Sequence, residues 1–163
     1  MPFGALLVES AVNSVIALLR SQFNTNLAVV WSNNPQPPVT LENLQISRFY
    51  VSEAIDPLQA PAIFVIADRS DHDLSAQNFA KQTHTLMVAV LVEDVEVETL
   101  TRKAWRYGQA AWLTLHDKAV GDIKILVEAL SYSPILGAAT RGEGRQFRKD
   151  VTLRLRVMHF ESF

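Results

Sequence analysis

Residues 151–158 read VTLRLRVM, the most regular alternation of apolar and polar side chains in the chain. Successive side chains of a β-strand point to opposite faces of its sheet, so one set should face a core and the other should face away from it. The inward set is Val151, Leu153, Leu155 and Val157, and the outward set is Thr152, Arg154, Arg156 and Met158. The segment therefore predicts a strand with one covered face, and the covering layer must come from elsewhere in the chain.

Further segments predict strands of the same sheet. Residues 61–67 (PAIFVIA) form a short apolar run that a proline opens, and residues 83–92 are rich in β-branched side chains. Residues 123–132 follow a Gly-Asp break and are again mostly apolar. Between Gln45 and Val51 the pattern allows a strand that contributes both faces, and residues 27–31 (LAVVW) are long enough for one short strand.

Two segments have the three- and four-residue spacing of α-helices. The first is expected from Ala5 to Phe23, and its apolar face consists of Val8, Val12, Val15, Ile16, Leu19 and Phe23. The second is expected from Glu96 to His116, where Trp105 and Trp112 flank the apolar face. A histidine suits the end of this helix because the last carbonyls of a helix lack partners within it.

The remaining segments are expected as connections. Prolines lack an amide donor and restrict the preceding residue, so the proline-rich residues 33–38 should form a loop. Residues 68–77 are expected as a turn-rich surface loop, and residues 133–144 as a long flexible loop or a hairpin tip. An antiparallel or mixed β-sheet with both helices packed on one face buries these patterns most simply. The prediction is a single α+β domain spanning residues 1–163.

Composition excludes several classes of protein. The chain has no cysteine, which removes disulfides, thiol nucleophiles and cysteine-based metal sites. No stretch approaches 18 uncharged apolar residues, so no membrane span is expected. The first residues carry no positive charge and do not resemble a signal peptide, which agrees with a cytosolic chain. A formal net charge of −2 gives no general attraction to nucleic acid or to anionic lipid.

Catalytic signatures are missing from the sequence, which contains no phosphate-binding loop, nucleophile elbow or HExxH motif. The best candidate for a metal or acid–base cluster is Asp68, Asp71, His72 and Asp73. A polar run after a buried strand is more often a solvated turn whose Asp and Ser side chains bond their own backbone. His84, His116 and His159 have no Ser or Asp nearby in sequence that would suggest a nucleophile. No catalytic residue, metal or cofactor is therefore predicted.

Charge is segregated along the chain. The acidic set is Glu93, Asp94, Glu96 and Glu98, and the basic set is Arg141, Arg145, Arg148, Lys149, Arg154 and Arg156. One interpretation is two independent solvated faces. The other is that the two sets meet on neighbouring copies, as a head-to-tail ring requires. A nucleic-acid-binding module using residues 141–156 is a third interpretation, less favoured because only Phe147 is an interleaved aromatic residue.

The order of these elements resembles that of the tail terminator or tail completion proteins of long-tailed bacteriophages. The resemblance rests on the amphipathic first helix, the strand opened by Pro61, the strand HTLMVAVLV (residues 84–92), the aromatic-bearing helix, and the strand ending LSYSP (residues 130–134). A loose loop and an alternating final strand complete it. Residues 33–60 depart from the compact form of that pattern.

The resemblance implies a structural virion protein without catalytic activity. Such a protein assembles in the host cytoplasm as a homo-oligomeric ring, taken as six-fold, at the head-proximal end of the tail. Its expected partners are the tail tube protein, whose growth the ring stops, and a head–tail connector protein. The acidic and basic sets above are then the expected contacts between subunits or with partners, and neither a membrane nor a specific nucleic acid is expected. Alternatives are another connector ring, such as a stopper or adaptor, and a small metal-dependent hydrolase.

Overall fold

The computed structural model describes residues 8–52, 60–76, 79–141 and 144–162, and it has an α+β fold, as the sequence predicts. Two α-helices, a single 3₁₀ turn and seven strands are described in these ranges. They are α1 (Val8–Asn33), the 3₁₀ turn (Ile46–Arg48), β1 (Phe49–Tyr50), β2 (Ala62–Ala76), β3 (Phe79–Asp94), α2 (Val97–Leu115), β4 (Lys118–Val120), β5 (Ile123–Tyr132), β6 (Leu136–Arg141) and β7 (Gly144–Ser162).

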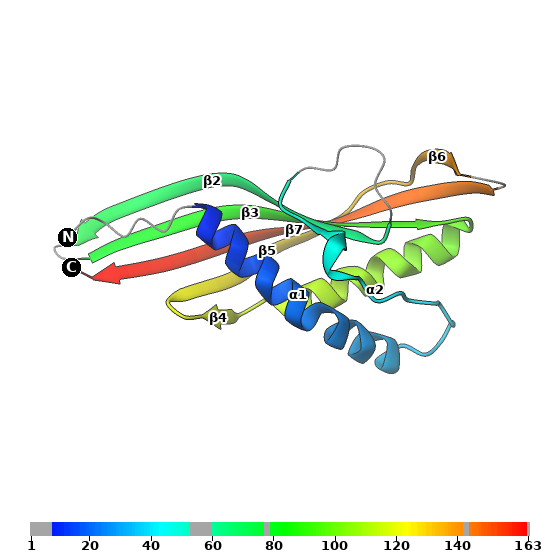
Figure 1. The fold of residues 1–163 in the computed structure, drawn as a ribbon, viewed down its shortest axis with the longest axis horizontal. Coiled ribbons are helices and arrows are strands. Elements are labelled where there is room, and N and C mark those ends of the chain that lie inside the picture. The colour runs from blue at the N-terminus through cyan, green and yellow to red at the C-terminus, as the bar shows by residue number, and fades with distance from the viewer. Residues whose placement is uncertain (1–7, 53–59, 77–78, 142–143, 163) are drawn as a thin grey trace.

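The strands form one mixed sheet in the order β1-β2-β3-β7-β5-β4, and β6 also pairs with β7 (Figure 1). Only the pairing of β1 with β2 is parallel, and the other described pairs are antiparallel. β7 is the central strand. It pairs with β3 along its whole length on one side, and with β6 and then β5 on the other.

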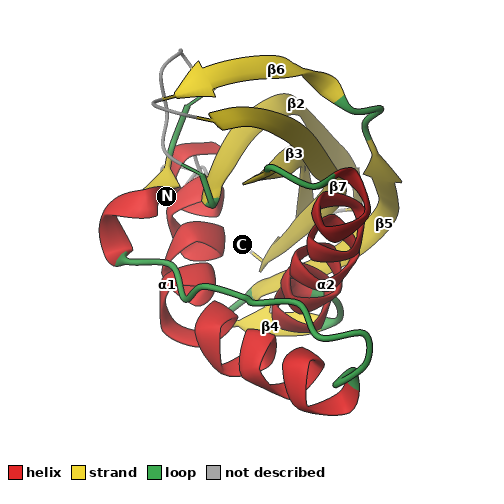
Figure 2. Ribbon diagram, turned by 90° about the vertical axis from the view of Figure 1, so that its right-hand side faces the viewer, coloured by secondary structure: helices red, strands yellow, loops and turns green. Residues whose placement is uncertain are grey.

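Both helices cover the same face of the sheet (Figure 2). The inward residues of β7 are completely buried there, whereas Arg154 and Arg156 are exposed on the opposite face. The alternation of residues 151–158 therefore has the predicted orientation. Burying each of these aliphatic side chains contributes about 1.5–3 kcal/mol to folding.

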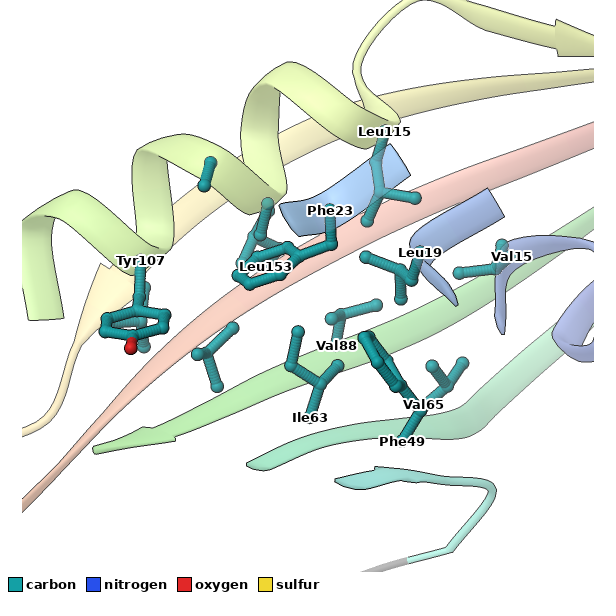
Figure 3. Close-up of a cluster of buried hydrophobic side chains, with 14 of the residues drawn as sticks. Val15, Leu19, Phe23, Phe49, Ile63, Val65, Val88, Tyr107, Leu115 and Leu153 are labelled. Atoms are coloured by element: carbon teal, nitrogen blue, oxygen red, sulfur yellow. The ribbon is translucent and has the colours of Figure 1, made fainter. Parts of the chain in front are cut away.

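An aromatic group holds α1, α2 and β1 together at the centre of the core (Figure 3). The rings of Phe23 and Tyr107 stack with centroids 6.1 Å apart, and Phe49 meets Phe23 edge-on at 6.3 Å. The Tyr107 hydroxyl accepts a hydrogen bond from the Glu42 amide and donates one to the Glu42 carbonyl, both at 2.7 Å. Burial raises the pKa of Tyr107, so the hydroxyl keeps its proton and can serve as the donor.

The second helix approaches the sheet most closely at Gly108. A β-carbon at this position would lie 2.8 Å from Cγ1 of Val151, closer than carbon atoms pack, and 3.7 Å from the ring of Tyr132. The glycine thus allows α2 to lie directly against β7.

The predicted strand at residues 27–31 is wrong, because α1 continues to Asn33. Leu27 and Val30 extend the buried stripe of Leu19 and Phe23 at helical spacing, so a single face is buried throughout. The helix ends where the Asn34 side chain donates a hydrogen bond to the Val30 carbonyl, just before the first proline. The predicted start at residues 5–7 lies outside the described residues.

The expected loop at residues 68–77 is also wrong. β2 continues through this polar segment to Ala76 because β3 offers a partner along its full length, and a bulge at Asp68 absorbs the irregularity. The strand allowed at residues 45–51 is reduced to Phe49 and Tyr50. For residues 133–144, a hairpin of β6 and β7 replaces the flexible loop, and residues 142–143 lie outside the described ranges.

We predict that Gly108→Ala destabilises the protein by about 1–3 kcal/mol, because the added methyl group overlaps Val151 and forces α2 away from β7. Urea unfolding followed by circular dichroism measures the change. Gly137→Ala is the matched control, since nothing lies within 4 Å of the β-carbon it adds. Equal stability of the two variants would contradict the close approach.

Candidate functional site

The face of the sheet opposite the helices carries a group of charged side chains. Glu128 lies at its centre, where a bulge in β5 between Val127 and Ala129 breaks the ladder with β7. Its carboxylate forms an ion pair with Arg156 and lies 3.8 Å from Nε of Arg154. The Glu128 side chain is 28% exposed, whereas the two arginines beside it are about half exposed.

A shallow hollow of about 310 Å³ joins this group to the neighbouring strands. β2 contributes Arg69 and Asp71, whose side chains form an ion pair at 2.9 Å, and β3 contributes Lys81 with Thr83 and Thr85. Four cationic and two anionic side chains line the hollow, so its net charge is positive. We call this surface, formed by Arg69, Asp71, Lys81, Thr83, Thr85, Glu128, Arg154 and Arg156, the charged face.

The acidic set predicted from sequence is largely engaged within the chain. Glu93 lies opposite Arg148 in the β3–β7 ladder and accepts a hydrogen bond from its Nε at 3.0 Å. This pair is partly buried, with 8% of the Glu93 side chain and 21% of the Arg148 side chain exposed. Glu98 pairs with Arg102 one turn along α2, and Glu96 accepts a hydrogen bond from the Thr99 hydroxyl. Both glutamates at the start of α2 remain exposed.

Asp94 points to the helix side of the sheet and forms an ion pair at 2.7 Å with Lys103 of α2. Partial burial opposes ionisation of Asp94, but the hydrogen bond and the charge of Lys103 outweigh it, and the pKa of the carboxyl lies below its usual value. The pair borders a polar hollow of about 230 Å³, which Glu42, Glu93 and Tyr107 also line. The polar groups of this hollow thus bond one another and tie α2 to the end of β3.

The basic set divides into four locations. Arg154 and Arg156 belong to the charged face, and Arg148 pairs with Glu93. Lys149 lies opposite Val92 and is half buried. Arg141 and Arg145 lie in the β6–β7 hairpin, where Arg145 is opposite Thr140, and their side chains are outside what the structure describes. The structure thus brings Glu93 and Arg148 together within one chain, and a contact of the two sets across copies stays a prediction.

The candidate metal cluster is distributed along β2. Asp71 and His72 are consecutive residues of this strand. Asp71 is paired with Arg69, and the side chains of His72 and Asp73 lie outside the described part. Among the residues that the structure does describe, no group of three or more His, Asp or Glu side chains could hold a metal ion.

Sequence reasoning missed several polar residues that organise the structure. One sequence feature could have identified Glu128, because it is the lone carboxylate in the mostly apolar segment of residues 123–132. Arg106, 7% exposed, donates a hydrogen bond at 2.8 Å to the Pro37 carbonyl, which sequence could not foresee. His84 is buried, with Nδ1 2.7 Å from the Ser70 hydroxyl. His116 does follow α2 as predicted, but its Nδ1 accepts the amide proton of Val127 in β5.

No helix in the described part of the chain is long and apolar enough to cross a membrane.

Comparison with known proteins gives matches among solved structures. No protein-family model matches the chain, and no curated protein matches it. Among solved structures, it is similar to a chain of the virion of a native gene transfer agent (GTA) particle. The two chains are 18% identical, the match covers 86% of this chain and 94% of the other, and the TM-score is 0.36.

We predict that Arg148→Met lowers the free energy of unfolding by about 1–3 kcal/mol, because it leaves the partly buried Glu93 carboxylate without its charged partner. Glu93→Gln in the same chain should recover part of this loss. Asp71→Ala is the control, and it should change stability by less than about 0.5 kcal/mol because its pair with Arg69 is exposed. Urea unfolding of the four proteins tests this, and an Arg148→Met variant as stable as the wild type would contradict it.

Proposed function

We propose that this protein is a structural component of a bacteriophage tail. In this proposal, copies of the chain form a ring, taken as hexameric, that caps the tail tube at its head-proximal end. The ring ends growth of the tube and offers a surface to the head–tail connector. The proposal assigns no catalytic role to the protein.

The observation that carries the proposal is the charged face. Residues of the four strands β2, β3, β5 and β7 form it. Both helices lie on the other side of the sheet (Figure 2). Ion pairing with Glu128 orients Arg156, and Arg154 lies next to the same carboxylate, so the two arginines are held on one side of the sheet. A rigid face of fixed charge suits recognition of a protein surface of complementary charge.

The β6–β7 hairpin supports a contact between neighbouring copies. It forms one end of the elongated molecule, and β3 ends near its base, where Asp94 lies opposite Phe147 (Figure 1). Glu96 and Glu98 are exposed at the start of α2, immediately after β3. We propose that Arg141 and Arg145 of one copy meet these two glutamates of the next copy, which would repeat head to tail around a ring.

We predict that Arg154→Glu combined with Arg156→Glu abolishes capping of tail tubes while the monomer stays folded. The inward residues of β7 are untouched, and like charges placed at a protein boundary can cost several kcal/mol. Electron microscopy of purified tail tubes mixed with the variant counts capped ends, and native mass spectrometry reports the ring. Capping at the wild-type level would contradict the role of the charged face.

A charge-swapped variant separates this effect from local destabilisation. The double variant sets three carboxylates beside one another, whereas adding Glu128→Arg restores opposite charges in the same places. The triple variant should therefore recover stability but not capping. If it recovers both, the double variant acts through folding alone. A wild-type ring that binds connector proteins but leaves tube ends uncapped would favour the stopper or adaptor alternative.

A further inference from the structure

The outer edge of β5 is open along part of its length. β4 pairs with this edge only from Ile123 to Ile125, and beyond that point β7 is the only strand that pairs with β5 among the described residues. The Val127 amide points outward and donates a hydrogen bond to Nδ1 of His116 at 3.2 Å. Within the described part of the chain, the outer edge of residues 128–132 therefore has no strand partner, and it lies at the rim of the sheet beside α2 (Figure 2).

This edge lacks the usual protection against pairing with another chain. Natural edge strands are commonly guarded by lysine, proline or several charges. Residues 128–132 read EALSY, and their one charge, Glu128, is engaged by Arg154 and Arg156 on the charged face. Ala129 and Ser131 are small and exposed, so nothing they carry would obstruct an added strand.

Exposed aromatic side chains flank the same edge. Trp105 and Trp112 of α2 are 48% and 38% exposed, and Tyr132 at the end of β5 is 42% exposed. The ring of Trp112 stacks on His116 at 4.6 Å, the histidine that binds the Val127 amide. A strand added to β5 would therefore cover apolar surface as well as satisfy backbone groups.

The other edge of the sheet has a different character. β1 pairs with β2 only at Ile63 and Phe64, and the strand beyond carries a bulge at Asp68 followed by the exposed Arg69–Asp71 ion pair. Bulges and charges of this kind keep an edge from adding a strand. The bulge and the charged side chains of the β2 edge therefore disfavour its pairing with the open β5 edge of another copy.

We propose that the open edge of β5 pairs with the same edge of a second copy, antiparallel about a two-fold axis. Pairing centred on Leu130 places Ala129 opposite Ser131 of the second copy, and the two Glu128 carboxylates then lie at opposite ends of the paired segment. The ladder stops at Val127, whose amide is already bonded to His116. Such a contact is isologous and closes at two copies. It goes beyond the proposed function, does not involve the β6–β7 hairpin, and borders the charged face at Glu128.

Cysteine cross-linking tests the contact, since the natural chain contains no cysteine. In the variant Ala129→Cys with Ser131→Cys, two thiols project from the same side of β5 at exposed positions. Residues two apart in a strand are too distant to bridge each other, so a disulfide must join two copies. The control is Thr25→Cys with Ser32→Cys, two exposed positions of α1 that lie about two turns apart and are too distant to bridge each other. Mild oxidation of the full chain should give a covalent dimer for the β5 variant and none for the control.

A second variant tests the same edge without cysteine. Ala129→Lys with Ser131→Lys guards the edge with like charges, and sedimentation velocity should show the dimer dissociation constant raised by about tenfold or more. A cross-linked ladder of higher oligomers, cross-linking no greater than in the control, or no effect of the lysines would each overturn the proposal. Capping of tail tubes is scored separately, so a lysine variant that is monomeric yet caps tubes supports the β5 contact and leaves the proposed function intact.

Discussion

The structure depends on the two-sided pairing of β7. This strand hydrogen-bonds β3 along one edge and both β5 and β6 along the other, so it joins β3 to β5 and β6 in one sheet. Its inward residues form the floor on which both helices pack, and Gly108 lets α2 approach that floor without a gap. Because the pleat alternates strictly, a shift of one residue in this register would bury Arg154 and expose Leu155. The register that keeps Arg154 exposed and Leu155 buried also determines which residues of β3, β5 and β6 lie opposite β7.

The same register decides where opposite charges meet. The sequence separates an acidic set from a basic set by more than forty residues, which suggests a contact between copies. The ladder of β3 and β7 instead puts Glu93 directly opposite Arg148, and the pair is partly buried within one chain. Glu128 reaches Arg154 and Arg156 because a bulge in β5 displaces it from the regular ladder. Opposite charges that are far apart in sequence therefore do not indicate a contact between copies until the strand pairing is known.

Local periodicity was sufficient to predict the elements in which the spacing of apolar residues alone determines the buried side. The final strand, the strands at residues 61–67, 83–92 and 123–132, and α2 all follow from such patterns. Residues 27–31 and 68–77 could not be predicted in the same way. LAVVW suits a strand in isolation, and it is helical because Leu27 and Val30 continue the buried stripe of α1. The polar residues after Asp68 form a strand only because β3 supplies the hydrogen bonds. For the same reason, no local signal pointed to Arg106 or to the bond between His116 and Val127.

The helices cover only one face of the sheet, so close packing constrains the side chains on that face and not those on the other. Every inward position of β7 must fit the helices, so its volume is constrained by close packing. Outward positions such as Thr152, Arg154 and Arg156 meet solvent and one another, and a change there leaves the core volume unaltered. The charge of the outer face can consequently be adjusted to a partner at little cost to folding, provided that Glu128 keeps an opposite charge beside it. The edge of β5 is subject to a third constraint under the proposed pairing, which would depend on its backbone groups and on small uncharged side chains beside them. A sheet arranged in this way can therefore present two surfaces that recognise partners by different chemistry and change independently of each other.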